Sequence, residues 1–153
     1  MFSRSAIVTE ATSWVGTPFQ HQGRTKGPHG GVDCVGLIIG VSKNLGYYPQ
    51  DVPHNYQKQP NTPMLNKTCE TLLTKPANRQ GLAKALPGDI LMFATNQAGQ
   101  GTHLAWAVML NGRLSMLHVM TTQGATVCMH RIAPPWTSKY LTTYTLPFTE
   151  EPA

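Results

Sequence analysis

The feature that most constrains this chain is a glycine-bearing loop that runs directly into an apolar segment headed by a cysteine. The loop spans residues 23–31, and the apolar segment spans residues 32–41. Asp33 is a preferred helix N-cap, so the sequence predicts a helix that starts there, with Cys34 in its first turn. Free N–H groups and the helix dipole favour a thiolate at that place. Cys34 is therefore a candidate nucleophile, and an ordinary buried thiol is the alternative.

The predicted helix carries two glycines that need a reason. Gly36 and Gly40 each cost a helix about 1 kcal/mol relative to alanine. We expect them to allow another part of the chain to approach closely. The apolar positions Ile38, Val41 and Leu45 follow Cys34 at helical spacing, so the thiol lies near the edge of the buried face.

Composition limits the classes of protein that this chain can belong to. Its 153 residues predict one domain, residues 1–153. The net charge is +5, but the basic residues are scattered, so we expect an anionic partner and no nucleic acid. No segment approaches membrane-spanning length, so we expect no membrane partner. The N-terminus lacks the apolar core of a signal peptide, so we expect no Sec export.

The chain has three cysteines, which excludes a complete disulfide framework. A Cys69–Cys128 pair would leave Cys34 free, and three free thiols are equally compatible with the count. The sequence leaves this choice open.

Periodicity and turn signals predict helices first and strands second, which is an α+β fold. A sheet of about five antiparallel strands is expected to follow the helices, and the proline-rich residues 47–63 are expected to form a loop between the second and third helices. The expected helices are residues 3–15, 33–45 and 65–73, and the expected strands are residues 90–95, 103–110, 113–120, 126–132 and 140–146.

A hairpin turn at Asn111-Gly112 makes a geometric prediction. A two-residue turn places Ala105 opposite His118 and His103 opposite Met120, so both histidines lie on one face of the sheet. Diagonal neighbours on such a face lie about 7–8 Å apart, within reach of long side chains.

The two histidines then have roles to fill beside a thiol. His103 could take the proton of Cys34 and form a thiolate–imidazolium pair, while His118 holds the His103 ring in the correct tautomer. The alternative is a solvent-exposed His103 with a structural His118. We expect no metal, because neither histidine shows the short ligand spacing of zinc sites. His54 and His130 are interpreted as structural or exposed.

With these residues named, the chain resembles the NlpC-type cell-wall peptidases, a papain-like family of cysteine peptidases. The similar blocks, in order, are WVGTPFQHQG, GVDCVGLIIGV, LPGDILMFA, THLAWAVMLNGRLSMLH and PPWTSKY. The resemblance implies a papain-like α+β fold without a cofactor. It also implies Cys34 as nucleophile, His103 as base and His118 as the residue that orients the base.

The resemblance also suggests residues around the oxyanion. The backbone N–H of Cys34 would contribute there, beside Asp33 of the family's Asp-Cys pair. The family usually has a tyrosine where this chain has Phe19, which leaves Gln20, His21 and Gln22 as candidate substitutes near the substrate.

The function implied by the resemblance is cleavage of peptide stems in bacterial peptidoglycan, commonly between γ-D-glutamate and a diamino acid. The expected partners are peptidoglycan or muropeptides, with phage tail components, secretion machinery or an immunity protein. The site of action would be the periplasm or cell wall, reached by a virion or a non-Sec route. The alternatives are a papain-like amidase or acyltransferase with another substrate, and an inactive cell-wall-binding or tail structural module.

Overall fold

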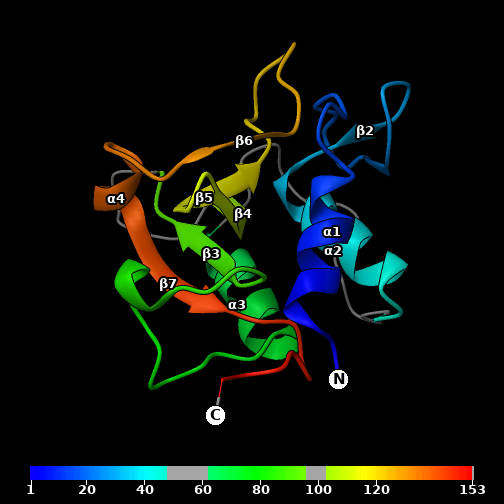
Figure 1. Ribbon diagram of the computed structural model, residues 1–153. Coiled ribbons are helices and arrows are strands. Elements are labelled where there is room, and N and C mark those ends of the chain that lie inside the picture. Colours follow the sequence, from blue (N-terminus) through cyan, green and yellow to red (C-terminus); the bar gives the residue numbers. More distant parts are fainter. Residues whose placement is uncertain (48–61, 96–102, 153) are drawn as a thin grey trace.

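The computed structural model of the chain describes residues 1–47, 62–95 and 103–152 (Figure 1). Helices precede the main sheet along the chain, as predicted. The helices are α1 (Arg4–Thr12), α2 (Cys34–Asn44), α3 (Thr62–Leu72) and the short α4 (Trp136–Lys139), with a 3-10 turn η1 at Leu82–Lys84. The antiparallel sheet has the order β6-β5-β4-β3-β7. Its strands are β3 (Ile90–Phe93), β4 (His103–Leu110), β5 (Arg113–His118), β6 (Cys128–Arg131) and β7 (Tyr140–Tyr144).

The N-terminal helices pack on one face of this sheet. Figure 1 shows α1 and α2 side by side next to the strands, and both helices contact β4. Leu104, Trp106 and Val108 of β4 are buried in the core that includes α2. The alternate residues Ala105 and Ala107 belong to a second, smaller cluster on the opposite face. The central strand β4 therefore carries both cores, as period-2 alternation requires.

Helix α2 begins where the sequence predicts. The Asp33 carboxylate accepts a hydrogen bond from the Gly36 N–H at 2.8 Å, which satisfies one free donor of the first turn. The helix ends at Asn44, and Gly46 follows with a φ of +97°. A Cβ at Gly36 would overlap the carbonyl oxygen of Gly23, and one at Gly40 would overlap the Trp14 ring. Both glycines thus permit the close approach that we expected.

The predicted hairpin register is confirmed. Trp106 pairs with Leu117 and Leu110 pairs with Arg113, so the turn has two residues. Asn111 and Gly112 have φ values of +52° and +75°, which is the left-handed conformation that asparagine and glycine tolerate in such turns.

Several expected boundaries differ from the structure. The first helix was predicted to run over residues 3–15, but α1 ends at Thr12 and Val15 is 44% exposed. The loop expected over residues 23–31 contains the strand β1 (Arg24–Thr25) and the start of β2 (Gly31–Val32), which pair in a two-stranded sheet. The strand expected over residues 113–120 is two residues shorter, because β5 ends at His118. Most of the proline-rich loop expected over residues 47–63 lies outside the described residues, as do residues 96–102 before β4.

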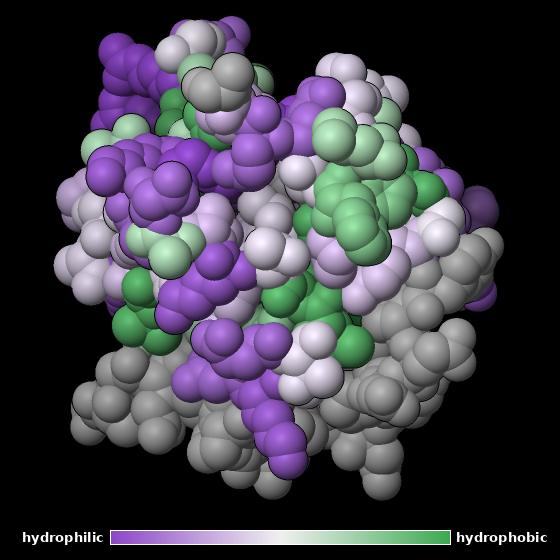
Figure 2. Space-filling model, turned by 90° about the horizontal axis from the view of Figure 1, so that it is seen from below, coloured by the Kyte–Doolittle hydropathy of each residue, from purple (hydrophilic) through white to green (hydrophobic). Residues whose placement is uncertain are grey.

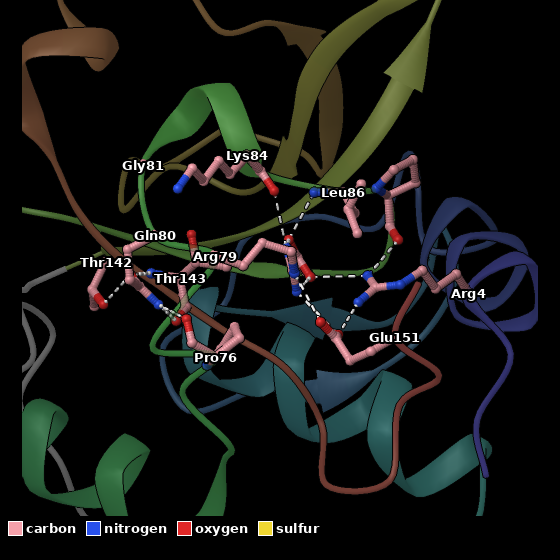
Figure 3. Close-up of polar contacts among 12 residues, drawn as sticks. Arg4, Pro76, Arg79, Gln80, Gly81, Lys84, Leu86, Thr142, Thr143 and Glu151 are labelled. Carbon is pink, nitrogen blue, oxygen red and sulfur yellow. Dashed lines mark hydrogen bonds and ion pairs between the residues drawn. The ribbon is translucent and has the colours of Figure 1, made fainter. Parts of the chain in front are cut away.

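A buried carboxylate ties the start of the sheet to both ends of the chain. Asp89 has no exposed surface, and it accepts hydrogen bonds from Arg4, Arg79 and the Leu86 N–H. Figure 3 shows Arg4 and Arg79 converging from opposite sides, with Glu151 near both guanidinium groups. The turn that leads into β3 is therefore fixed to α1 and to the C-terminal segment.

The surface mixes residue types. On the face shown in Figure 2, hydrophobic residues form separate groups among hydrophilic ones. Within the described residues, no helix has both the length and the apolar character needed to cross a membrane.

Candidate active site

Cys34 sits in the first turn of α2, against the beginning of β4. Its residue is 4% exposed. Backbone groups of Leu104, Val35 and Cys34 itself face the thiol and oppose the rise in its pKa that burial causes. Because Leu104 directly follows His103 along β4, the packing of α2 on the sheet brings the thiol to the strand end that carries the first predicted histidine.

Burial sets the protonation of this thiol. It raises the pKa of Cys34 to about 12, with a further rise from the Asp33 charge and an opposing effect of the backbone hydrogen bonds. Burial also lowers the pKa of His103 to about 4. The environment therefore favours a neutral thiol and a neutral imidazole at rest. Desolvation therefore opposes the thiolate–imidazolium pair expected from the sequence, whereas the helix end favours it.

His103 and His118 meet on one face of the sheet, as the hairpin register predicts. Nε2 of His103 and Nδ1 of His118 are 2.8 Å apart, and the rings are arranged edge to face. The residues are 4% and 1% exposed. Because both imidazoles are buried, water does not compete for the hydrogen bond between them.

A third histidine, the half-buried His130, extends the pair. Nε2 of His118 lies 2.7 Å from Nε2 of His130, and Nδ1 of His130 lies 2.9 Å from the carbonyl oxygen of Arg131. His118 pairs with Cys128 across β5 and β6, which makes His130 its diagonal neighbour. No tight turn joins β5 to β6, so the sequence offers no register from which to find this contact.

The carbonyl oxygen at the end of the chain of histidines dictates the direction of every hydrogen bond. A carbonyl oxygen only accepts, so Nδ1 of His130 carries the proton and, in the neutral ring, Nε2 accepts. Nε2 of His118 then donates to His130, and Nδ1 of His118 accepts from Nε2 of His103. The neutral His103 ring therefore has its lone pair on Nδ1. Within the described part of the chain, Nε2 carries the only hydrogen bond of that ring.

Trp136 of α4 covers the histidines and was missed as a site residue. Its ring centroid lies 5.2 Å from those of His103 and His118, tilted against the first and edge-on to the second. Lys139 places its ammonium 5.7 Å from the Trp136 ring centroid. The PPWTSKY block carried the signal for this tryptophan. The indole excludes water from the histidine pair, in keeping with the lowered pKa values.

The residues suggested for the oxyanion or substrate lie in the segment leading to α2. Asp33 is a structural cap, and its carboxylate also accepts from the Gln22 N–H at 2.6 Å. His21 is close to it, with Nδ1 3.9 Å from the carboxylate. The Phe19 backbone bridges Val32 and the Ala125 carbonyl.

Gln20 lies in the same segment but on the outside. Its side chain is exposed, and its amide atoms lie against Gly31. The structure thus brings the suggested residues to one segment before Cys34, but their part in binding stays a prediction.

The structure also shows the state and the burial of the other thiols and of His29. The three cysteines are free, so the open question of a Cys69–Cys128 disulfide is answered against the bond. Cys69 is buried in the helical core, whereas Cys128 is half-buried on β6. His29 is exposed, and His54 lies outside the described residues.

Comparison with solved structures identifies the fold. No protein-family model matches the chain, and no curated protein matches its sequence. Among solved structures, the NlpC/p60 domain of the peptidoglycan hydrolase SagA matches with a TM-score of 0.57 and 21% identity, over 94% of this chain and 98% of that one. An NlpC/p60 family protein from Bacillus cereus ATCC 10987 matches with a TM-score of 0.61 and 17% identity, over 92% of this chain and 39% of that one. The chain therefore has the α+β fold of NlpC/p60 domains and spans under half of the second protein.

Proposed function

We propose that this chain is a cysteine peptidase that cleaves the peptide stems of bacterial peptidoglycan. The observation that carries the proposal is the hydrogen-bonded His103–His118 pair at the strand end against which the Cys34 thiol packs. It occurs in a fold shared with a domain described as part of a peptidoglycan hydrolase. The net charge of +5 suits a substrate that bears free carboxylates.

In the proposed first half-reaction, His103 acts as the general base because the Cys34 thiol starts in its neutral form. Nδ1 of His103 takes the proton of Cys34 as the sulfur attacks the amide carbonyl carbon. The His103 imidazolium keeps its second proton on Nε2, which donates a hydrogen bond to Nδ1 of His118. Backbone N–H groups at the start of α2 stabilise the developing oxyanion.

The first half-reaction ends when the C–N bond breaks, as His103 gives its proton to the leaving amine and a thioester to Cys34 remains. In the second half-reaction, His103 takes a proton from water, whose oxygen attacks the thioester carbonyl carbon. The C–S bond then breaks, the acid leaves, and His103 returns the proton to the sulfur, which restores the thiol.

His118 and His130 act in this scheme as positioning residues. Neither contacts the reacting atoms, and their hydrogen bonds keep the lone pair of His103 on Nδ1. The γ-D-glutamyl–diamino acid bond is the proposed point of cleavage, because the family that the sequence resembles commonly cuts there. The delivery route and the other expected partners stay predictions.

Digestion of purified peptidoglycan followed by mass spectrometry tests the proposal. New muropeptides ending at γ-D-glutamate, formed by the wild type and not by Cys34→Ala, are the expected result. Intact peptidoglycan with both proteins would contradict the substrate. Acyl transfer to an added amine without net hydrolysis would support the acyltransferase alternative instead.

A further inference from the structure

Beyond the His103–His118 pair, a second cluster of chemically capable side chains lies at the edge of the sheet. His118 of β5 is the register partner of Cys128 on the edge strand β6, and His130 lies two residues further along the same face. The ligand atoms of these three residues all lie within 4.8 Å of one another. His118 is buried, and the other two residues are half-buried, so the cluster has a protected side and an open side.

We propose that His118, Cys128 and His130 bind one Zn²⁺ ion, with a fourth coordination position open to water. Two imidazoles and one thiolate are ligands that zinc prefers, and the cluster offers no oxygen ligand for calcium or magnesium. The sequence predicts no metal site, because His103 and His118 alone lack ligand spacing. The cluster instead depends on β6, whose alternation places Cys128 and His130 on one face.

The surroundings of His130 already match those of a metal ligand, and those of His118 match after one proton shift. A histidine that binds a metal through one nitrogen usually donates its other N–H to a carbonyl or another acceptor. Nδ1 of His130 is held by the Arg131 carbonyl, and Nδ1 of His118 by Nε2 of His103. Both Nε2 atoms therefore point at the shared position, where they are now 2.7 Å apart across one proton.

Binding requires all three ligand side chains to move. A tetrahedral zinc with a Zn–S bond of about 2.3 Å places sulfur and nitrogen about 3.5 Å apart, so Sγ of Cys128 must close a separation of up to 4.8 Å. Tetrahedral zinc with Zn–N bonds of about 2.0–2.1 Å separates two nitrogens by about 3.3 Å, so the rings must move apart by about 0.6 Å. The proton between them shifts from Nε2 to Nδ1 of His118, and the thiol of Cys128 releases its proton to solvent. One proton per ion is thus released.

Metal binding would reverse the hydrogen bond to His103, a consequence that rests on the proposed function. Once Nδ1 of His118 carries a proton, it donates to Nε2 of His103, and the neutral His103 ring must hold its own proton on Nδ1. That nitrogen can no longer accept the proton of Cys34. Zinc at the sheet edge is therefore an inhibitor that acts without touching the nucleophile.

Cobalt and zinc titrations of chelator-treated full-length protein test the site without reference to activity. Co²⁺ should bind one ion per chain and produce a thiolate-to-cobalt charge-transfer band, which Zn²⁺ then removes. Cys128→Ser should abolish that band. His130→Gln should weaken Zn²⁺ binding by more than about 100-fold, since even second-shell changes cost 10–100-fold. Cys34→Ala, Cys69→Ala and His29→Gln are controls that should bind as the wild type does.

The outcomes separate this proposal from the peptidase proposal. Loss of the band in Cys34→Ala, its survival in Cys128→Ser, or no stoichiometric binding would overturn the metal site. If the site binds metal, Zn²⁺ should inhibit the wild-type peptidase and spare Cys128→Ser, with circular dichroism confirming the fold of the variant. Equal inhibition of both would overturn the regulatory consequence. A protein that binds Co²⁺ through Cys128 but leaves peptidoglycan intact would contradict the peptidase proposal alone.

Discussion

Nε2 of His103 and Nδ1 of His118 lie 2.8 Å apart on one face of a hairpin whose two-residue turn sets their register. The contact gives His118 a specific role: it accepts a hydrogen bond from Nε2–H of His103, the proposed base. His118→Ala should therefore lower kcat by about 100-fold, within the range of general acid–base contributions, and leave residual turnover. His118→Asn, which retains an acceptor, should recover part of the loss. Steady-state kinetics on a purified muropeptide would show this, and a His118→Ala defect equal to that of Cys34→Ala would contradict the separation of roles.

His130 should influence His103 without touching it. In the wild type, the Arg131 carbonyl directs the hydrogen bonds so that His103 carries its proton on Nε2. His130→Ala removes the acceptor of His118 and should give a mixture of His103 tautomers, with kcat reduced about tenfold. Imidazole ¹⁵N chemical shifts report the tautomer directly. His130→Gln, which restores an acceptor, should recover the wild-type pattern, and an unchanged His103 spectrum in His130→Ala would exclude the relay.

The resting thiol should behave as a neutral group. Because burial raises the pKa of Cys34 to about 12, its thiolate fraction should rise about tenfold per pH unit through the neutral range. Alkylation of Cys34 by iodoacetamide, followed by peptide mass spectrometry, should therefore accelerate steadily from pH 6 to pH 9. Cys128 in the same samples serves as an internal control for reagent activity. A rate for Cys34 that is independent of pH over that range would indicate a preformed thiolate–imidazolium pair.

Helix α2 and the hairpin could be predicted because short-range chemistry determines them. The Asp33 cap, Gly46 and the Asn111-Gly112 turn mark the ends of α2 and the register of β4 with β5. His130 and Trp136 could not be placed in this way. Their positions depend on how β6 and α4 return to the sheet after segments without tight turns, which is a matter of tertiary packing.

The effect of burial on the Cys34 thiol could not be predicted, for a similar reason. Helix-end stabilisation of Cys34 can be read from local sequence, but its desolvation depends on β4, which lies far along the chain. The same applies to the ion-pair network of Asp89, whose partners Arg4, Arg79 and Glu151 come from distant segments.

Asp89 should be important for stability. Its carboxylate is fully buried between two guanidinium groups and the Leu86 N–H. Asp89→Asn places an NH₂ group against these donors and removes the buried negative charge that faces Arg4 and Arg79, which should reduce the free energy of unfolding by about 3–5 kcal/mol. Urea denaturation would measure this. Glu151→Gln, at the 42% exposed rim of the network, should cost no more than about 1 kcal/mol, and equal losses would contradict the role of burial.

Turnover of a purified muropeptide by the wild type, Cys34→Ala and Cys69→Ala, at equal concentrations of folded protein, tests the nucleophile. Both cysteines are buried and free, so the second variant controls for the loss of a packed thiol. We predict cleavage by the wild type and Cys69→Ala, and none by Cys34→Ala. Full turnover by Cys34→Ala would contradict the assignment of Cys34 as the nucleophile, and with it the peptidase mechanism.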